Sequence, residues 1–272
     1  MASNANPNTD EARHAELVHE ARKTIKRMRA LARLLRYELG DEELKRVNAS
    51  LRAAGQRLAG SRDAEVRLAT LDRLKARHPE ALAGAGVERL RERLAREREK
   101  ASEPEREQEV LGDLGEMRRE AARWKLVDHD FQAVEPGLRR IYREGRRRYR
   151  MLARQKTSGV EATHDWRKRV KGLYYALDML GGAQTKGTRG ATRRAERLGD
   201  VLGEEHDLWL LATYVEQHPE TFENDPSTRK ALLELADRRR NRLRKRALTQ
   251  GARLYRRKPG AFTRRAGSSL AG

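Results

Sequence analysis

The sequence predicts an all-α protein organised around two similar basic helices. Three observations support this fold class. Leu and Ala recur at helical spacing through most of the 272 residues, Gly and Pro are concentrated between the periodic segments, and alternating strand patterns are nearly absent. Aromatic residues make up only 5% of the chain, which is typical of an all-helical composition.

The segment that organises the chain is 164–180, HDWRKRVKGLYYALDML. Basic residues recur there at i, i+3, i+4 and i+7, and apolar residues form a stripe on another helix face. Residues 19–35, HEARKTIKRMRALARLL, repeat both patterns at a constant offset of 145 residues, which we interpret as an internal duplication. The basic positions are His19, Arg22, Lys23 and Lys26 in the first copy and His164, Arg167, Lys168 and Lys171 in the second.

This basic pattern does not favour a helix by itself, because cations one turn apart repel each other. Either solvent screens the repulsion or an anion binds along the face.

The remaining elements follow from caps, chain breaks and periodicity. In order, we expect a disordered lead over 1–10, helices over 10–39, 41–59 and 61–77, a small-residue linker over 80–86, a charged helical hairpin over 87–127, helices over 131–156, 159–180 and 191–202, a break and a new helix starting near residue 206, a last long helix over 226–249, and a flexible basic tail over 259–272. The two halves, 11–156 and 159–258, together form one domain over 11–258. Each half ends in an arginine-rich helix, at 138–150 and 238–246.

The net charge of +20, from 61 basic and 41 acidic residues, predicts a polyanionic partner such as polyphosphate, nucleic acid or an anionic membrane. The alternative is that many of the arginines form a solvated face. The chain has no cysteine, which excludes disulfides, thiolate catalysis and cysteine-bound zinc, and which fits a reducing cytoplasm. No run of about 18 apolar residues predicts a membrane span, and the polar first ten residues predict no secretory signal.

With the repeated His-x-x-Arg-Lys-x-x-Lys motif, the LGxxxHD-type turn and the YREGRRR helix, the chain resembles the CHAD family (conserved histidine α-helical domain) over residues 11–258. The resemblance implies two pseudo-symmetric four-helix bundles facing each other across a basic cavity. It also implies non-catalytic binding of inorganic polyphosphate, often at polyphosphate granules. The triphosphate-tunnel domain that many relatives carry has no counterpart motif here.

The resemblance also assigns binding residues. In the two basic motifs it adds Arg27 to the eight positions above. At the matching turns, Leu58…Arg62-Asp63 and Leu202…His206-Asp207, it assigns Arg62 and His206. In the arginine-rich helices it assigns Arg139, Arg143, Arg146, Arg147, Arg239, Arg242 and Arg246.

Other functions fit the residues less well. A metal site at His19, His164 and His206 is disfavoured, because neighbouring arginines repel a cation and no paired carboxylates accompany the histidines. A metal-dependent polyphosphate or phosphate-ester hydrolase needs a general acid that the sequence does not locate. RNA or DNA binding would favour aromatic platforms beside the basic residues, so only weak, non-specific binding is expected. We therefore predict a polyphosphate-binding protein with no catalytic residues, metal or cofactor and no insertion into a membrane.

Overall fold

The computed structural model describes residues 7–100, 104–128, 130–156, 159–181 and 187–268, with the side chains of 7–15, 59–62 and 104–107 left out. Every regular element described is a helix, which confirms the all-α class. The elements are α1 (Pro7–Leu34), α2 (Arg36–Arg57), α3 (Ala59–Arg77), α4 (Ala85–Lys100), α5 (Pro104–Ala121), α6 (Asp130–Ala153), α7 (Gly159–Met179), α8 (Arg189–Gln217), the 3-10 helix η1 (Pro219–Phe222), α9 (Pro226–Leu254) and α10 (Pro259–Gly267).

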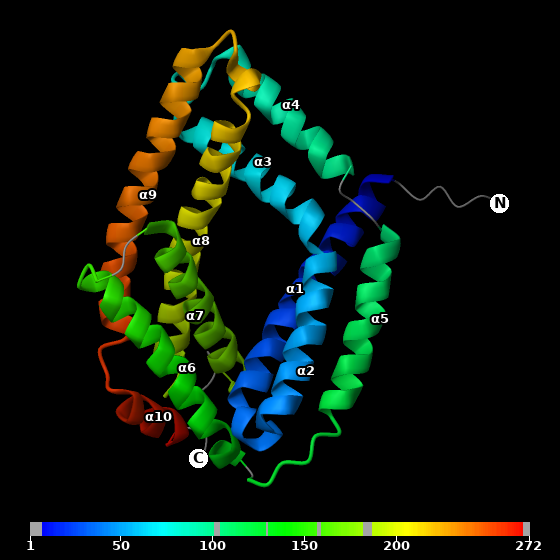
Figure 1. Cartoon of the computed structure of the whole chain (residues 1–272), viewed down its shortest axis with the longest axis vertical. Coiled ribbons are helices and arrows are strands. Elements are labelled where there is room, and N and C mark those ends of the chain that lie inside the picture. Colours follow the sequence, from blue (N-terminus) through cyan, green and yellow to red (C-terminus); the bar gives the residue numbers. More distant parts are fainter. Residues whose placement is uncertain (1–6, 101–103, 129, 157–158, 182–186, 269–272) are drawn as a thin grey trace, which may run out of the picture.

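The helices are arranged around the long axis of the molecule (Figure 1). Helices α8 and α9 pack side by side along one edge, and α1, α2 and α5 pack together along the other. At one end α3 and α4 reach across to contact α8 and α9. Near the other end α6 and α7 pack on α1, and α10 packs on α6.

Two hydrophobic cores hold these helices together. The smaller core joins α1, α2 and α5 through residues such as Ile25, Leu51 and Val110. The larger core joins α3 and α4 to α6–α10 and to the C-terminal part of α1, and it includes Leu71 and Trp166. Because α3 and α4 belong to the first predicted half and α8 and α9 to the second, the cores do not divide at the boundary between the halves.

Both ends of α1 lie close to the expected positions. Residues 7–10, expected in a disordered lead, already belong to α1, while residues 1–6 lie outside the described part. The first helix ends at Leu34 rather than near residue 39. The chain then turns within α2 at Gly40, whose φ of 74° falls in the left-handed region that glycine adopts without steric cost.

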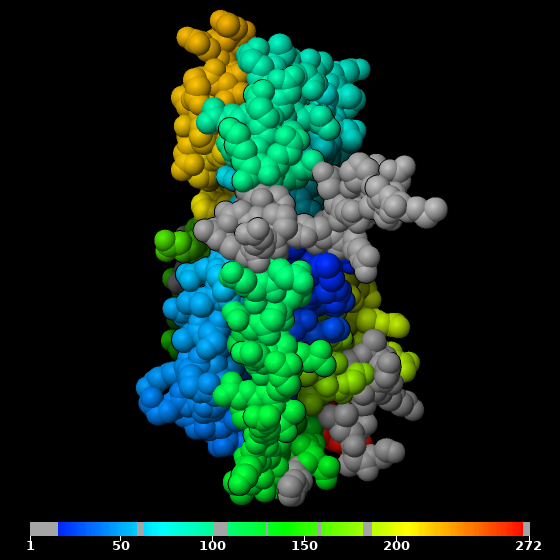
Figure 2. All heavy atoms as spheres, turned by 90° about the vertical axis from the view of Figure 1, so that its right-hand side faces the viewer, coloured from blue at the N-terminus to red at the C-terminus, as the bar shows by residue number. Residues whose placement is uncertain are grey.

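The charged segment 87–127 is not a helical hairpin, and that prediction was wrong. Helix α4 packs on α3, α9 and η1 through buried Val87, Leu90 and Leu94. Helix α5 packs on α1 and α2 and lies over them in Figure 2. Because charged residues dominate both helices, the sequence pattern did not indicate the few apolar positions through which each helix packs on a different neighbour.

Two further expectations in the second half are corrected. Helix α8 is continuous through the expected break near residue 206, because its apolar stripe continues without interruption across Leu202 and Leu208, both buried. The expected tail over 259–272 contains α10, of which residues 259–268 are described. Pro259 begins this helix, and Phe262 stacks on Tyr142 of α6 with ring centroids 3.9 Å apart.

Candidate polyanion-binding site

The two basic motifs meet where α1 and α7 cross. The Arg27 guanidinium donates to the Asp178 carboxylate at 3.2 and 3.3 Å. The Lys26 ammonium lies 6.0 Å from the centroid of the Tyr175 ring. Both contacts involve residues in the C-terminal parts of the two helices, and Figure 1 shows α1 and α7 running apart toward their N-terminal ends. The motifs therefore meet at their lysine ends, and His19 and His164 lie on diverging arms.

The basic residues of α1 lie on the side of the helix that contacts α7. Ala30, only 1% exposed, is part of the core that α1 shares with α7. Residues four, seven and eleven positions before Ala30 occupy the same helix face, on the N-terminal side of the contact with α7. We call them the α1 stripe: His19, Lys23 and Lys26.

The α7 helix repeats this arrangement. Tyr175, which contacts Lys26, lies four, seven and eleven residues after three basic residues on one face. We call these residues the α7 stripe: His164, Lys168 and Lys171. The two stripes therefore diverge from one crossing. Each stripe lies on the face of its helix that contacts the other helix. Arg22 and Arg167 lie half-buried beside the stripes.

A histidine pair links the α7 stripe to α8. The rings of His164 and His206 are 4.4 Å apart between centroids, and His206 also stacks on Trp209 at 5.5 Å. Within the described residues, the buried Nδ1 of His164 has no hydrogen-bond partner. His206 reaches this pair from the middle of α8, one turn before Trp209.

The electrostatic environment of the pair is strongly positive. Burial, and then the neighbouring Arg167, His164 and Lys168, lower the pKa of His206 to about 4. Burial, then Lys168 and Arg167, lowers the pKa of His164. Both imidazoles are therefore neutral near pH 7, since the surrounding cations oppose an added proton.

Acidic residues neutralise part of this charge. Lys171 pairs with Asp200 at 3.1 Å, and Lys23 pairs with Glu20 at 3.1 Å. Lys26 and Lys168 are exposed. The stripes therefore carry lysines at the solvent-exposed surface.

The arginines of α9 divide between carboxylates and solvent. Arg239, a predicted site residue, shares Glu204 with Arg77 of α3. Arg240 and Arg244 bind the buried carboxylate of Glu205, and both were missed by the sequence prediction. They share a helix face with buried Ala236, Leu243 and Ala247, a spacing that could have identified them. Arg242 and Arg246 are exposed.

The predicted arginines of α6 lie on a different surface from the histidine pair. The side of α6 that contacts α7 carries Glu144 and Arg148, which pair with Arg169 and Asp165. The neighbouring face forms an open groove of about 290 Å³ next to Pro259. Its basic lining residues are Arg143, Arg146, Arg147, Arg150, Arg154 and Lys156.

Two predicted residues remain. Arg139 pairs with Glu135 on its own helix. The side chain of Arg62 lies outside the described part. A single groove lined by every predicted residue is therefore not what the described residues form.

Across the described ranges, no set of three His, Asp or Glu side chains converges as a metal ion would require. None of the helices in those ranges combines the length and the low charge of a membrane span.

The fold and site define an all-helical protein with paired basic helix faces. The chain belongs to the CHAD domain family, whose model matches residues 3–216. No curated protein matches the chain. The match ends in α8, so α9 and α10 lie outside it although both pack into the larger core.

Proposed function

We propose that this chain binds inorganic polyphosphate along the α1 and α7 stripes, without catalysis, and that it associates with polyphosphate granules in the cytoplasm. The observation that carries the proposal is the meeting of the two stripes at one crossing. A linear anion lying across the crossing can contact both arms. Membership of the CHAD family is consistent with this ligand.

The charge around the histidine pair supports an anionic ligand. The low pKa of His206 is partly due to Arg167 and Lys168, which repel an added proton. A bound phosphate would offset that repulsion and accept hydrogen bonds from the imidazoles. The same repulsion that opposes helix formation in the free protein would then favour binding.

The spacing of the stripes favours an extended ligand. From His164 to Lys171 the α7 stripe covers about 10 Å of helix axis, and the α1 stripe covers the same length. A chain with one negative charge per unit can meet several of these cations in parallel. Arg groups beside the stripes supply paired donors, and the lysines act as mobile point charges.

The matching register of the stripes also supports an internal duplication as their origin. In both helices the basic residues lie four, seven and eleven positions before a residue at the crossing, Ala30 or Tyr175. A duplicated helix would supply both arms of one binding surface.

Charge reversal on the exposed stripe lysines tests the proposal. A Lys26→Glu/Lys168→Glu variant is expected to bind long-chain polyphosphate at least tenfold more weakly, since each lost charge-assisted hydrogen bond contributes roughly 1.5–3 kcal/mol. By analogy with single-stranded nucleic acid, the slope of log Kd against log salt concentration falls by roughly 0.7 per lost contact.

Lys230→Glu/Lys245→Glu is the matched control, because both lysines are exposed on α9 and the change in net charge is the same. Circular dichroism verifies that both variants keep their helicity. Equal weakening in the two variants would show that only net charge matters and would overturn the assignment to the stripes.

The two rival functions have their own assays. Nucleic-acid binding predicts that RNA displaces polyphosphate at equal phosphate concentration, whereas we expect polyphosphate to displace RNA. Hydrolysis predicts release of orthophosphate from polyphosphate with Mg²⁺ or Mn²⁺, whereas we expect none. Metal-dependent release that is lost in His164→Gln would establish an enzyme instead.

A further inference from the structure

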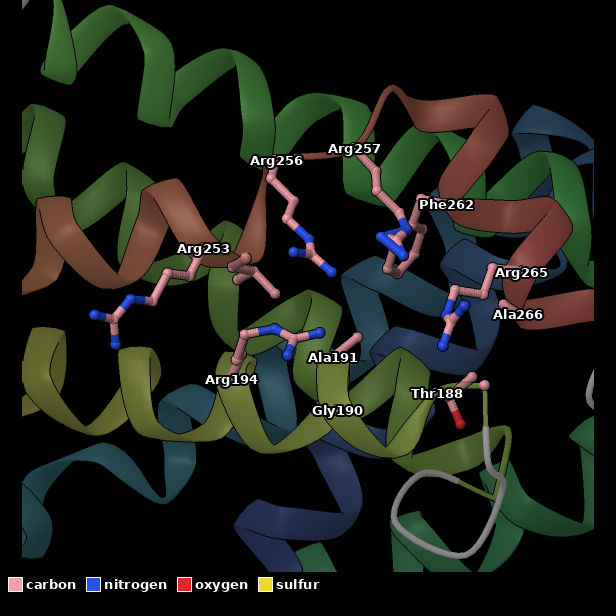
Figure 3. Close-up of a pocket in the computed structure, with 12 residues that line it drawn as sticks. Thr188, Gly190, Ala191, Arg194, Arg253, Arg256, Arg257, Phe262, Arg265 and Ala266 are labelled. Atoms are coloured by element: carbon pink, nitrogen blue, oxygen red, sulfur yellow. The ribbon is translucent and has the colours of Figure 1, made fainter.

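A second cluster of arginines surrounds a small cavity that no stripe residue lines (Figure 3). The cavity has a volume of about 170 Å³ and lies between the start of α8 and the connection from α9 to α10. Five of the twelve described residues that line it are arginines, and none of the twelve is an Asp or Glu. The arginines are Arg194, Arg253, Arg256, Arg257 and Arg265.

Three of these side chains concentrate charge in one place. Figure 3 shows the guanidinium groups of Arg194, Arg256 and Arg257 pointing into the same space, while that of Arg253 points away. Burial lowers the pKa of Arg194, and Arg256 and Arg257 lower it further. The buried Nε of Arg194 has no hydrogen-bond partner among the described residues.

The start of α8 adds positive potential to this space. The Arg194 guanidinium lies against the first turn, with both Nη atoms 3.3 Å from the position that a Cβ would take on Gly190. The N-terminus of a helix carries roughly half a positive charge and favours anions over cations. A cation in this position is unfavourable, and a phosphate between the arginines and the helix end would make it favourable.

The other walls of the cavity are apolar and firmly packed. Leu254, Phe262 and Ala266 are buried, and Phe262 is held by its stacking on Tyr142. An apolar wall strengthens electrostatic attraction because it excludes water. Since a water molecule occupies about 30 Å³ in the liquid, the cavity has room for several waters or for one or two phosphate groups.

We propose that this cavity binds a compact phosphate group, as orthophosphate, pyrophosphate or the end of a phosphate chain, independently of the two stripes. Four of the five arginines, in α9, α10 and the connection between them, lie beyond the region matched by the CHAD family model. Arg194 and the start of α8, by contrast, lie inside that region.

Calorimetric titration of the full chain with pyrophosphate tests the proposal. Arg194→Gln and Arg256→Gln are each expected to weaken binding roughly tenfold or more, as expected for the loss of a charge-assisted hydrogen bond. The adjacent, exposed Arg193→Gln and the exposed Arg264→Gln are matched controls that lie outside the cavity and should bind as the wild type does.

A thermal measurement separates binding from folding. Without ligand, Arg194→Gln is expected to unfold at the same or a higher temperature than the wild type, because it removes a partly buried cation from a repulsive cluster. Pyrophosphate should raise the unfolding temperature of the wild type and of the controls but not that of Arg194→Gln. Arg256 is exposed, so Arg256→Gln carries the test if Arg194→Gln fails to fold.

Three outcomes would overturn the proposal: no pyrophosphate binding to the wild type, equal loss in the cavity variants and the controls, or binding that disappears in Lys26→Glu/Lys168→Glu. That stripe variant should keep its affinity for pyrophosphate, so failure of the stripes and failure of the cavity are distinguishable. Comparing pyrophosphate with long-chain polyphosphate in the Arg194→Gln variant identifies the source of the group. Loss for both ligands indicates that chain ends also enter the cavity, and loss for pyrophosphate alone indicates a site for the free anion.

Discussion

Glu205→Gln is expected to destabilise the protein far more than the same change at the preceding residue. The carboxylate of Glu205 is only 2% exposed and accepts hydrogen bonds from Arg240 at 3.3 Å and Arg244 at 2.9 Å. Glutamine keeps the shape and one oxygen acceptor but removes the charge, which leaves two guanidinium groups without a counter-ion.

The expected cost follows from burial. Breaking a buried ion pair costs about 3–5 kcal/mol, and the partial exposure of Arg244 places the cost of this variant at about 3 kcal/mol. Glu204 also binds two arginines, Arg77 and Arg239, but it is 21% exposed. Solvent-screened pairs contribute roughly 0.2–1 kcal/mol each, so Glu204→Gln is expected to cost about 1 kcal/mol.

Urea unfolding followed by circular dichroism measures both variants, with an unchanged slope as the condition for comparing midpoints. The two residues are adjacent, lie on one helix and each bind two arginines, so burial is the main difference between them. Equal losses in the two variants, or a loss below about 1 kcal/mol for Glu205→Gln, would refute the reasoning.

The remaining predictions concern the histidine pair and the contact between α1 and α6. The free energy of unfolding is expected to fall as the pH is lowered from 6.5 to about 4, because the unfolded chain protonates His206 in this window and the folded protein does not. A His206→Gln variant whose free energy of unfolding depends on pH as that of the wild type does would contradict this. Polyphosphate is expected to raise the pKa of His206 above about 4. An NMR titration in which polyphosphate leaves this pKa unchanged would show that the ligand does not bind at the histidine pair. Gly137→Ala is expected to destabilise the protein because its Cβ would collide with the Leu34 carbonyl, whereas Gly112→Ala has open surroundings and gains about 0.8–1 kcal/mol of helix propensity; equal shifts in unfolding temperature would count against the close contact.

Helical periodicity was sufficient to predict helices close to their observed bounds in segments such as 61–77, 131–156 and 226–249. The α7 stripe was predicted correctly as one face because spacing along a helix determines which residues are neighbours. Periodicity did not predict that α8 continues past Gly203. The helix continues because a glycine costs only about 1 kcal/mol in a helix, and the packing of Leu202 and Leu208 outweighs this cost.

Periodicity also cannot say which helix meets which. The resemblance to the CHAD family assigned Arg239, Arg242 and Arg246 as site residues, while Arg240 and Arg244 face the buried carboxylate of Glu205. The difference depends on the rotation of α9 against α8, which is determined by the packing of Leu243 and its neighbours.

The sequence by itself determined the all-α class, the two basic motifs and the excess of positive charge, because these depend only on composition and on neighbours along one helix. Tertiary structure alone decided that the motifs meet at their lysine ends, that His206 joins His164, and that five arginines and the start of α8 surround one cavity. These features bring together residues that are distant in the chain, and only the packing of several helices at once determines such distances.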